Sequence, residues 1–152
     1  MSDQLQRILY VSRWSNGLGE DMGAALHRIV AASAAKNRLA DITGLLVAHE
    51  GWFLQALEGP PSALSALIVA IGRDPRHRDL RVLQSGPDTV RLFGDWSMAG
   101  ARLGPETEPL LTELGQLARF DGHGLDADGA LQLLMAAAES VRPGVGLGRN
   151  AA

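Results

Sequence analysis

Two strand-like runs separated by a two-residue turn constrain the fold of this chain more than any other feature. Residues 41–49 read DITGLLVAH and residues 52–58 read WFLQALE, and only Glu50 and Gly51 lie between them. Strand-forming runs on either side of a short turn that contains Gly are typical of a β-hairpin. We therefore expect the chain to be built around an antiparallel pair of strands.

The spacing of apolar residues predicts five further elements around this hairpin. They are a strand over residues 6–14, a helix over 20–37, a helix from Pro60-Pro61-Ser62 to residues 72–75, and strands over 80–85 and 90–98. Ser62 is expected to be the N-cap of the second helix, because Ser is a preferred capping residue. The order βαββαββ fits a ferredoxin-like α+β fold, one sheet with both helices on one face. The length of 152 residues suits one domain.

Beyond Pro105 the pattern changes to two amphipathic helices. The first carries the stripe Leu110, Leu111, Leu114 and Leu117, and the second carries Leu131, Leu134, Met135 and Ala138. Because each helix is too short to hold a core of its own, both are expected to pack on the sheet or on another subunit. The Gly-rich end from Pro143 is expected to be frayed.

Charge and the rarer residue types exclude several classes of function. The chain has 14 Lys and Arg against 17 Asp and Glu, a net charge of -3, so nucleic acid is not an expected partner. The absence of Cys excludes disulfides and thiolate metal sites, and the four His lack metal-ligand spacing. No apolar run approaches the ~18 residues of a membrane span. We predict a cytoplasmic protein with no metal site and no membrane segment.

Four polar residues occupy positions that the pattern assigns to buried faces. Ser33 and Asn37 continue the apolar stripe of the first helix, and Tyr10 and Gln55 alternate with apolar residues on their strands. An unpaired buried polar group costs about 1 to 3 kcal/mol, so each must find a partner. Two interpretations stay open. In the first, Asn37 is a helix C-cap, and Gln55 either pairs with Tyr10 in the core or is exposed on the outer side of the sheet. In the second, all four side chains hold a polar ligand between sheet and helices.

Six segments of the chain together resemble a known family. They are Leu9-Tyr10-Val11-Ser12-Arg13, Ser33-x-x-Lys36-Asn37, Ile42-Thr43-Gly44-Leu45-Leu46, Phe53-Leu54-Gln55-Ala56-Leu57-Glu58-Gly59, Asp74-Pro75-Arg76-His77 and Trp96-Ser97-Met98. Their order and spacing resemble those of BLUF domains, blue-light sensors that use FAD, over about residues 5–103. The likeness is greatest to short members of the family, in which a lone BLUF domain carries two C-terminal helices.

The resemblance implies a role for each matching residue. The flavin-binding residues it implies are Tyr10, Ser33, Lys36, Asn37, Gln55, Asp74, Arg76 and His77, and the photoactive residues are Tyr10, Gln55, Trp96 and Met98. Tyr10 and Gln55 would form a hydrogen-bond relay to the flavin, and Asn37 would bind the polar edge of its ring. Trp96 and Met98 would lie on the last strand near Gln55 and carry the signal, and which of the two points inward stays open. The cofactor implied is FAD, with FMN or riboflavin as alternatives.

The resemblance also implies a division of the chain and a kind of output. Residues 1–103 would form the flavin-binding domain, 104–143 a helical cap or output segment, and 144–152 a flexible tail. Such a protein turns over no substrate and would signal through the last strand and the C-terminal helices, as a homo-oligomer or to an unidentified partner protein. Two alternatives remain from other classes. They are a flavin-dependent oxidoreductase and a light-inactive oligomerisation module.

Overall fold

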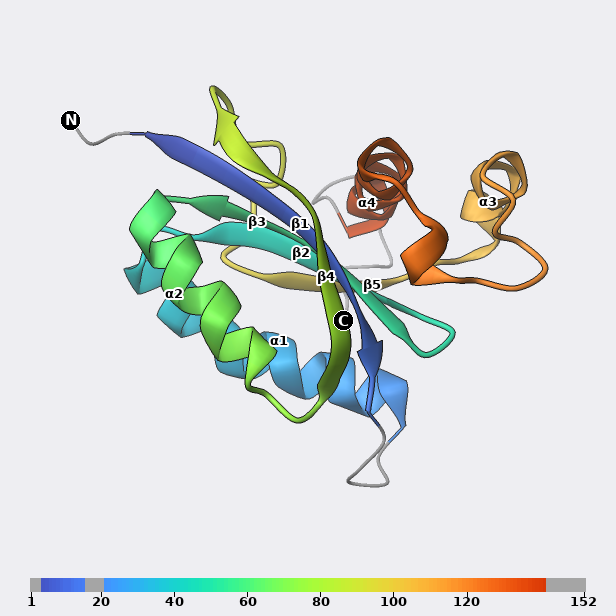
Figure 1. The fold of residues 1–152 in the computed structure, drawn as a ribbon, viewed down its shortest axis with the longest axis horizontal. Helices are drawn as coiled ribbons and strands as arrows, with labels where there is room; N and C mark the ends of the chain where they lie inside the picture. Colours follow the sequence, from blue (N-terminus) through green and yellow to red (C-terminus); the bar gives the residue numbers. More distant parts are fainter. Residues whose placement is uncertain (1–3, 16–20, 142–152) are drawn as a thin grey trace.

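A computed structural model describes residues 4–15 and 21–141 of the chain (Figure 1). The strands are β1 (Leu5–Trp14), β2 (Thr43–His49), β3 (Trp52–Gly59), β4 (His77–Asp88) and β5 (Ala99–Arg102). The helices are α1 (Met22–Leu39), α2 (Pro61–Gly72), α3 (Glu108–Glu113) and α4 (Ala127–Val141), with short 3-10 turns at η1 (Pro105–Thr107) and η2 (Gly122–Gly124).

The five strands form one sheet in the order β4-β1-β3-β2-β5. Every neighbouring pair is antiparallel except β2 and β5, which run parallel. The predicted hairpin joins β2 to β3, and its two turn residues, Glu50 and Gly51, have φ angles of 48° and 86°. Positive φ at both central positions is the geometry of a type I′ turn, whose twist matches that of the flanking strands. The ferredoxin-like α+β fold predicted from the sequence is confirmed.

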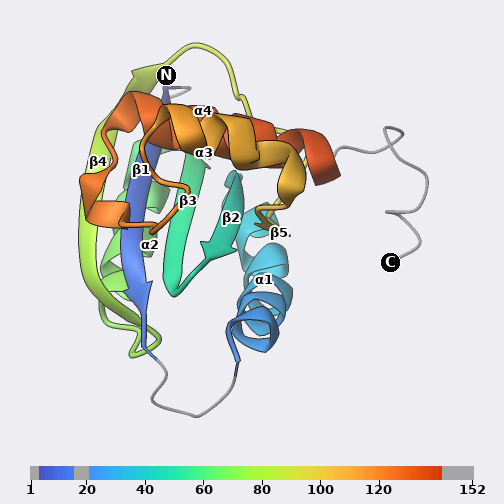
Figure 2. The ribbon, with the colours of Figure 1, turned by 90° about the vertical axis from the view of Figure 1, so that its right-hand side faces the viewer.

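Helices cover both faces of the sheet (Figure 1). On one face, called the helix-covered face below, α1 and α2 bury a cluster that includes Ile8, Phe53 and Leu57 of the strands. On the opposite face, called the outer face below, α4 crosses the strands (Figure 2) and buries a second cluster that includes Leu9 and Leu54. Because side chains alternate along a strand, each central strand contributes to both clusters. α4 thus packs on the sheet, one of the two arrangements predicted for the C-terminal helices.

The predicted strand over residues 90–98 is wrong. This segment is irregular, β4 extends from His77 to Asp88, and the last strand is Ala99–Arg102. The backbone N–H groups of Leu92 and Phe93 donate to the buried Glu58 carboxylate, at 2.7 and 2.9 Å, and so do not form a strand ladder. Trp96 and Met98 consequently precede the last strand and do not lie on it.

Two predicted helix caps are also wrong. The N-cap of α2 is Pro60, which makes no side-chain capping bond, and Ser62 lies within the first turn. Pro61 begins this helix because its fixed φ suits the first helical position, where a missing N–H costs nothing. α1 continues past Asn37 to Leu39 and is capped by Ala40, so Asn37 is not its C-cap.

The first of the two C-terminal helices is shorter than its leucine stripe predicts. α3 ends at Glu113, and Gly115 follows with a φ of 71°, a conformation that terminates a helix. Leu117 therefore lies outside the helix and is 44% exposed. The side chain of Gln116 instead organises the following turn, because its Oε1 accepts the Asp121 N–H at 2.7 Å and its Nε2 donates to the Asp121 carbonyl at 3.2 Å.

Across residues 4–15 and 21–141, no helix has the length and apolar character needed to cross a membrane. The predicted tail, residues 144–152, lies outside the described part of the chain.

Candidate functional site

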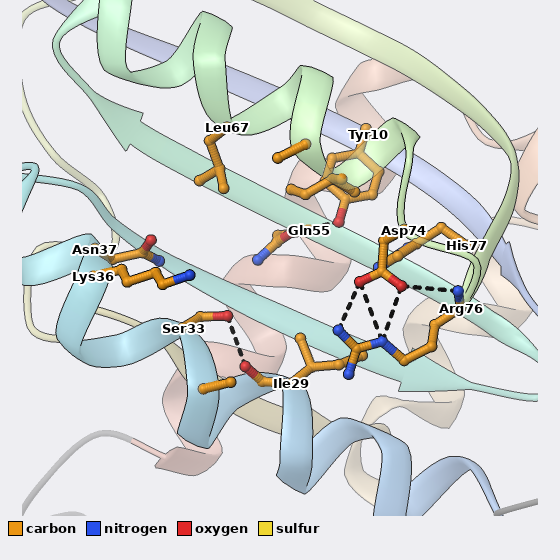
Figure 3. Close-up of a pocket in the computed structure, with 13 residues that line it drawn as sticks. Tyr10, Ile29, Ser33, Lys36, Asn37, Gln55, Leu67, Asp74, Arg76 and His77 are labelled. Atoms are coloured by element: carbon orange, nitrogen blue, oxygen red, sulfur yellow. Dashed lines mark hydrogen bonds and ion pairs between the residues drawn. The ribbon is translucent and has the colours of Figure 1, made fainter. Parts of the chain in front are cut away.

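A cavity of ≈ 210 Å³ lies between α1 and α2, above the central strands (Figure 3). Its apolar lining comes from the two helices and includes Ile29, Leu67 and Ile71. Its polar lining contains all eight residues that the sequence marked for flavin binding: Tyr10, Ser33, Lys36, Asn37, Gln55, Asp74, Arg76 and His77. The fold therefore brings residues from β1, α1, β3, the segment after α2 and the first residue of β4 to one place.

Tyr10 and Gln55 face each other at the floor of this cavity. They are directly opposite in the antiparallel register of β1 and β3, so both side chains emerge on the helix-covered face. The Tyr10 hydroxyl donates a hydrogen bond to Gln55 Oε1. Tyr10 is fully buried, and this burial, reinforced by the negative charge of Asp74, raises the pKa of the phenol. Tyr10 is thus held protonated with its proton directed at Gln55.

The other end of the Gln55 amide contacts Met98. Gln55 Nε2 donates to Met98 Sδ at 3.2 Å, and a thioether is a weak acceptor. Met98 belongs to the core on the helix-covered face, whereas Trp96 is half-buried and packs against the core on the outer face. Of the two residues that the sequence left undecided, Met98 is therefore the one beside Gln55.

Ser33 and Asn37 line the cavity from α1. Asn37 is buried and its Nδ2 donates to the Ser97 carbonyl at 3.1 Å, while Ser33 Oγ donates to the Ile29 carbonyl at 2.6 Å. Within the described residues, Asn37 Oδ1 accepts no hydrogen bond. A buried amide oxygen without a donor is costly, so the cavity presents a polar group that a ligand would satisfy.

The segment after α2 closes one end of the cavity with an ion pair and a histidine. Arg76 Nη2 lies 2.6 Å from Asp74 Oδ2, and these hydrogen bonds lower the pKa of the Asp74 carboxyl. His77 is buried with its Nδ1 2.8 Å from Ser12 Oγ. Burial lowers the pKa of His77 to about 4, against the opposing attraction of Asp74, so its ring is neutral at pH 7.

Lys36 differs from the other polar residues of the lining because it is exposed. Figure 3 shows its side chain extending from α1 into the cavity. Among the described residues its ammonium group has neither an ion pair nor a hydrogen bond. A cation is thus available at the mouth of a cavity whose other cation, Arg76, is paired with Asp74.

A buried charge network on the outer face of the sheet, opposite the cavity, was not predicted from the sequence. Glu58 is fully buried on β3 and binds Arg7 of β1, with Arg7 Nε 3.0 Å from Glu58 Oε2. Arg91, from the chain between β4 and β5, donates to the Glu58 carbonyl at 3.3 Å. The available signal was a pair of charged residues, Arg7 and Glu58, at positions of two apolar strands that alternation places on a buried face.

Comparison with known proteins identifies this arrangement. Residues 5–99 match the family described as "Sensors of blue-light using FAD", abbreviated BLUF. The chain belongs to the BLUF family. The match covers strands β1 to β4, both helices of the cavity and the segment that carries Met98, which confirms the resemblance found in the sequence.

The BLUF relatives with curated functions are longer proteins. The chain is 33% identical over 117 residues to photoactivated adenylate cyclase subunit beta of Euglena gracilis, a match that spans 76% of this chain and 14% of that protein. It is 30% identical over 118 residues to subunit alpha of the same organism, across 76% of this chain and 12% of the relative. The chain thus spans between one seventh and one eighth of the length of these proteins.

Solved BLUF structures match nearly the whole chain. The dark-state structure of the BLUF protein BlrB is 31% identical, with a TM-score of 0.71 over 90% of this chain and 96% of that one. The ground state of BlsA is 26% identical, with a TM-score of 0.78 over 88% of this chain and 89% of that one. These matches extend past residue 99, so similarity to short BLUF proteins includes part of the C-terminal region.

Proposed function

We propose that this BLUF protein is a blue-light photoreceptor that binds FAD in the cavity between α1 and α2 and switches through Tyr10 and Gln55. The observation that carries the proposal is the hydrogen bond from Tyr10 to Gln55 at the cavity floor. The amide of Gln55 has only the weak sulfur acceptor of Met98 on its other side. The amide nitrogen of Gln55 would therefore exchange this weak hydrogen bond for one to a stronger acceptor.

The lining fits a flavin ring, which has two apolar faces and one polar edge. Ile29, Leu67 and Ile71 supply apolar contacts from the two helices. Asn37 Oδ1 accepts no hydrogen bond within the described residues, and the ring edge would offer it an N–H donor. Ligand sites commonly combine apolar walls with a few placed polar groups. Lys36 and Arg76 at the cavity mouth suit the phosphate-bearing tail.

The proposed mechanism moves one proton along one hydrogen bond. A bound flavin would supply blue-light absorption and an excited state that accepts an electron. Tyr10 would lose an electron and pass its hydroxyl proton to Gln55 Oε1, the atom to which it already donates. Gln55 would then rotate or tautomerise and offer a different hydrogen bond to the flavin carbonyl. The electron and the proton would then return to Tyr10, so the switch would consume no substrate and the protein would act as a sensor and not as an enzyme.

The test is an absorption spectrum of the purified protein before and after blue light. We expect a yellow protein whose flavin band shifts slightly to the red on illumination and recovers in the dark. Heat denaturation should release the flavin, and chromatography of the released compound distinguishes FAD from FMN and riboflavin. A colourless protein that also fails to bind added FAD would contradict the proposal. Steady NADH consumption by a yellow protein without a light-induced shift would instead indicate an oxidoreductase.

We further propose that the output of the switch passes through residues 104–143 to a homo-oligomer or a partner protein, with residues 1–103 acting as the flavin-binding unit. The supporting feature is the leucine-rich segment around α3, where Leu117 is 44% exposed and Leu110 and Leu114 are only partly buried. Light scattering and hydrogen exchange in dark and light should report a light-dependent change there. An unchanged assembly and unchanged exchange in this segment would contradict this route.

A further inference from the structure

The chain between β4 and β5, residues 89–98, links the two edges of the sheet. β4 and β5 are the outermost strands of the order β4-β1-β3-β2-β5, so this connection must pass the ends of the three central strands (Figure 1). It also changes face, because Phe93 and Trp96 belong to the core on the outer face and Met98 belongs to the core on the helix-covered face. The position of Met98 beside Gln55 therefore depends on how this irregular connection is held.

A row of three side chains at the ends of the central strands meets the connection. Arg7, Glu58 and Thr43 are direct cross-strand neighbours on β1, β3 and β2. They follow the alternation of Leu54 and Ala56, so they emerge on the outer face beyond its apolar core. The connection covers this row, and Glu58 at its centre has no exposed surface.

The Glu58 carboxylate binds backbone N–H groups of the connection directly. Oε2 accepts the Leu92 N–H at 2.7 Å and the Arg7 guanidinium at 3.0 Å. Oε1 accepts the Phe93 N–H at 2.9 Å and the Thr43 hydroxyl at 3.2 Å. An ionised carboxylate is an acceptor only and has about four lone-pair sites, which these four donors fill. Bonds of this charge-assisted kind are shorter and stronger than those between neutral groups.

The other half of the connection is held through its own carbonyl groups. The Gly44 N–H donates to the Trp96 carbonyl at 3.1 Å, and Asn37 Nδ2 donates to the Ser97 carbonyl at 3.1 Å. On the β4 side of this segment, the Glu58 bonds fix the backbone of residues 92 and 93, which are not paired in a strand ladder. Any slip of the chain at Leu92 and Phe93 would be transmitted toward Met98.

We propose that Glu58 is a positioning residue for the photoswitch. It fixes residues 92 and 93 so that Met98 stays against the Gln55 amide in the dark. This role rests on the proposed function, since it concerns the same Gln55 switch. Loosening the connection should ease the movement of Gln55 and Met98 in both directions, and so accelerate the return from the lit state.

Glu58→Gln in the full chain is the direct test. An amide keeps the shape but turns one acceptor oxygen into a donor, which cannot receive the backbone N–H that faces it. We expect unchanged flavin content and dark recovery about tenfold faster, which corresponds to ~1.4 kcal/mol of barrier. Dark hydrogen exchange at Leu92 and Phe93 should also be faster. Thr43→Val removes one of the four donors to Glu58 and also the acceptor of a 2.9 Å bond from Arg91 Nη1, which lies in the same connection. It leaves the other three Glu58 bonds in place, so it should change recovery in the same direction by a smaller factor, and it serves as the test if Glu58→Gln does not fold.

Two controls separate positioning from other effects. Glu113→Gln makes the same chemical change at an exposed position on α3 and should recover at the wild-type rate. Leu133→Ala weakens the core on the outer face without touching the Glu58 bonds. Wild-type recovery in both Glu58→Gln and Thr43→Val, or equal acceleration in Leu133→Ala, would overturn the inference. A wild-type protein with no light-induced shift would instead contradict the proposed function.

Discussion

The two faces of the sheet are made by the same strands but differ in chemistry. Along β3, Leu54 and Ala56 point into the outer face, where α4 covers an apolar core, while Gln55 between them points toward α1 and α2. The helix-covered face buries Tyr10, Asn37, Gln55 and His77 around a cavity. The outer face is close-packed around its apolar core and has its buried charges at the strand ends, whereas the helix-covered face has its buried polar groups around a cavity, the usual composition of a ligand site.

The largest effect should come from removing the Gln55 amide on the helix-covered face. Gln55→Leu keeps roughly the side-chain volume and removes the group that changes its hydrogen bond. We expect this variant to bind flavin and to lose the light-induced red shift completely. Tyr10→Phe should behave alike, because it keeps the ring and removes the transferable proton. Absorption difference spectra measure both.

The matched control for this change is Gln84→Leu, the same substitution at an exposed position of β4. It should retain a normal photocycle. A normal red shift in Gln55→Leu would remove this amide from the mechanism and would erase the functional distinction between the two faces.

A core substitution on the outer face should lower stability and leave the light-induced red shift unchanged. Leu133 of α4 is fully buried, and large-to-small changes in a core cost about 2 to 5 kcal/mol of unfolding free energy. Leu133→Ala should lower the midpoint of urea denaturation and leave the size of the red shift unchanged. Leu131→Ala, at a half-buried position of the same helix, should cost less. A red shift abolished in folded Leu133→Ala would show that both faces form the switch.

Burial of His77 on the helix-covered face should also make the free energy of unfolding depend on pH. Its pKa is about 4 in the folded protein against 6.5 for an ordinary His, so between these values the unfolded chain binds a proton that the folded chain does not. Stability should therefore fall as pH decreases from about 6.5 to 4 and show no further loss from His77 below that range. The loss from this group is at most on the order of 3 kcal/mol.

Urea denaturation across this pH range measures the effect. His77→Gln retains a hydrogen-bonding group near Ser12, and its free energy of unfolding should fall less than that of the wild type as the pH decreases from 6.5 to 4. His27→Gln, at an exposed site on α1, is the control and should keep the wild-type dependence. An identical pH profile in wild type and His77→Gln would show that burial of His77 has little energetic consequence.

The smallest effect is expected for Trp96→Ala. Trp96 packs against the core on the outer face, and Met98 is the residue that contacts Gln55. Flavin content and the size of the red shift should be unchanged, and dark recovery should change roughly twofold, equivalent to about 0.4 kcal/mol. Loss of the red shift in this variant would place Trp96 at the switch, and loss of flavin would make it mainly a core residue.

Local sequence patterns predicted most of the fold and the placement of Tyr10 and Gln55. Alternation along β1 and β3 put Tyr10 and Gln55 on one buried face, and the turn residues Glu50 and Gly51 set the hairpin register. The irregular segment before β5 was missed because its residues alternate like a strand, while the Glu58 carboxylate that binds its backbone lies far away in the sequence. The choice between Trp96 and Met98 depends on that segment, so no local pattern could decide it.

The parallel pairing of β2 with β5 has a consequence for the order of folding. Leu45 pairs with Ala99 only after the intervening chain has passed from one edge of the sheet to the other, whereas β2 and β3 meet through a two-residue turn. Non-local pairings close late because loop entropy opposes them, and a four-residue edge strand has one neighbour to hold it. β5 is therefore expected to dock last and to open at a lower free energy than the rest of the sheet, as a separate cooperative unit. Met98, whose sulfur contacts the Gln55 amide, directly precedes β5, so opening of this unit is expected to release Met98 while the ladder between β1 and β3 stays intact.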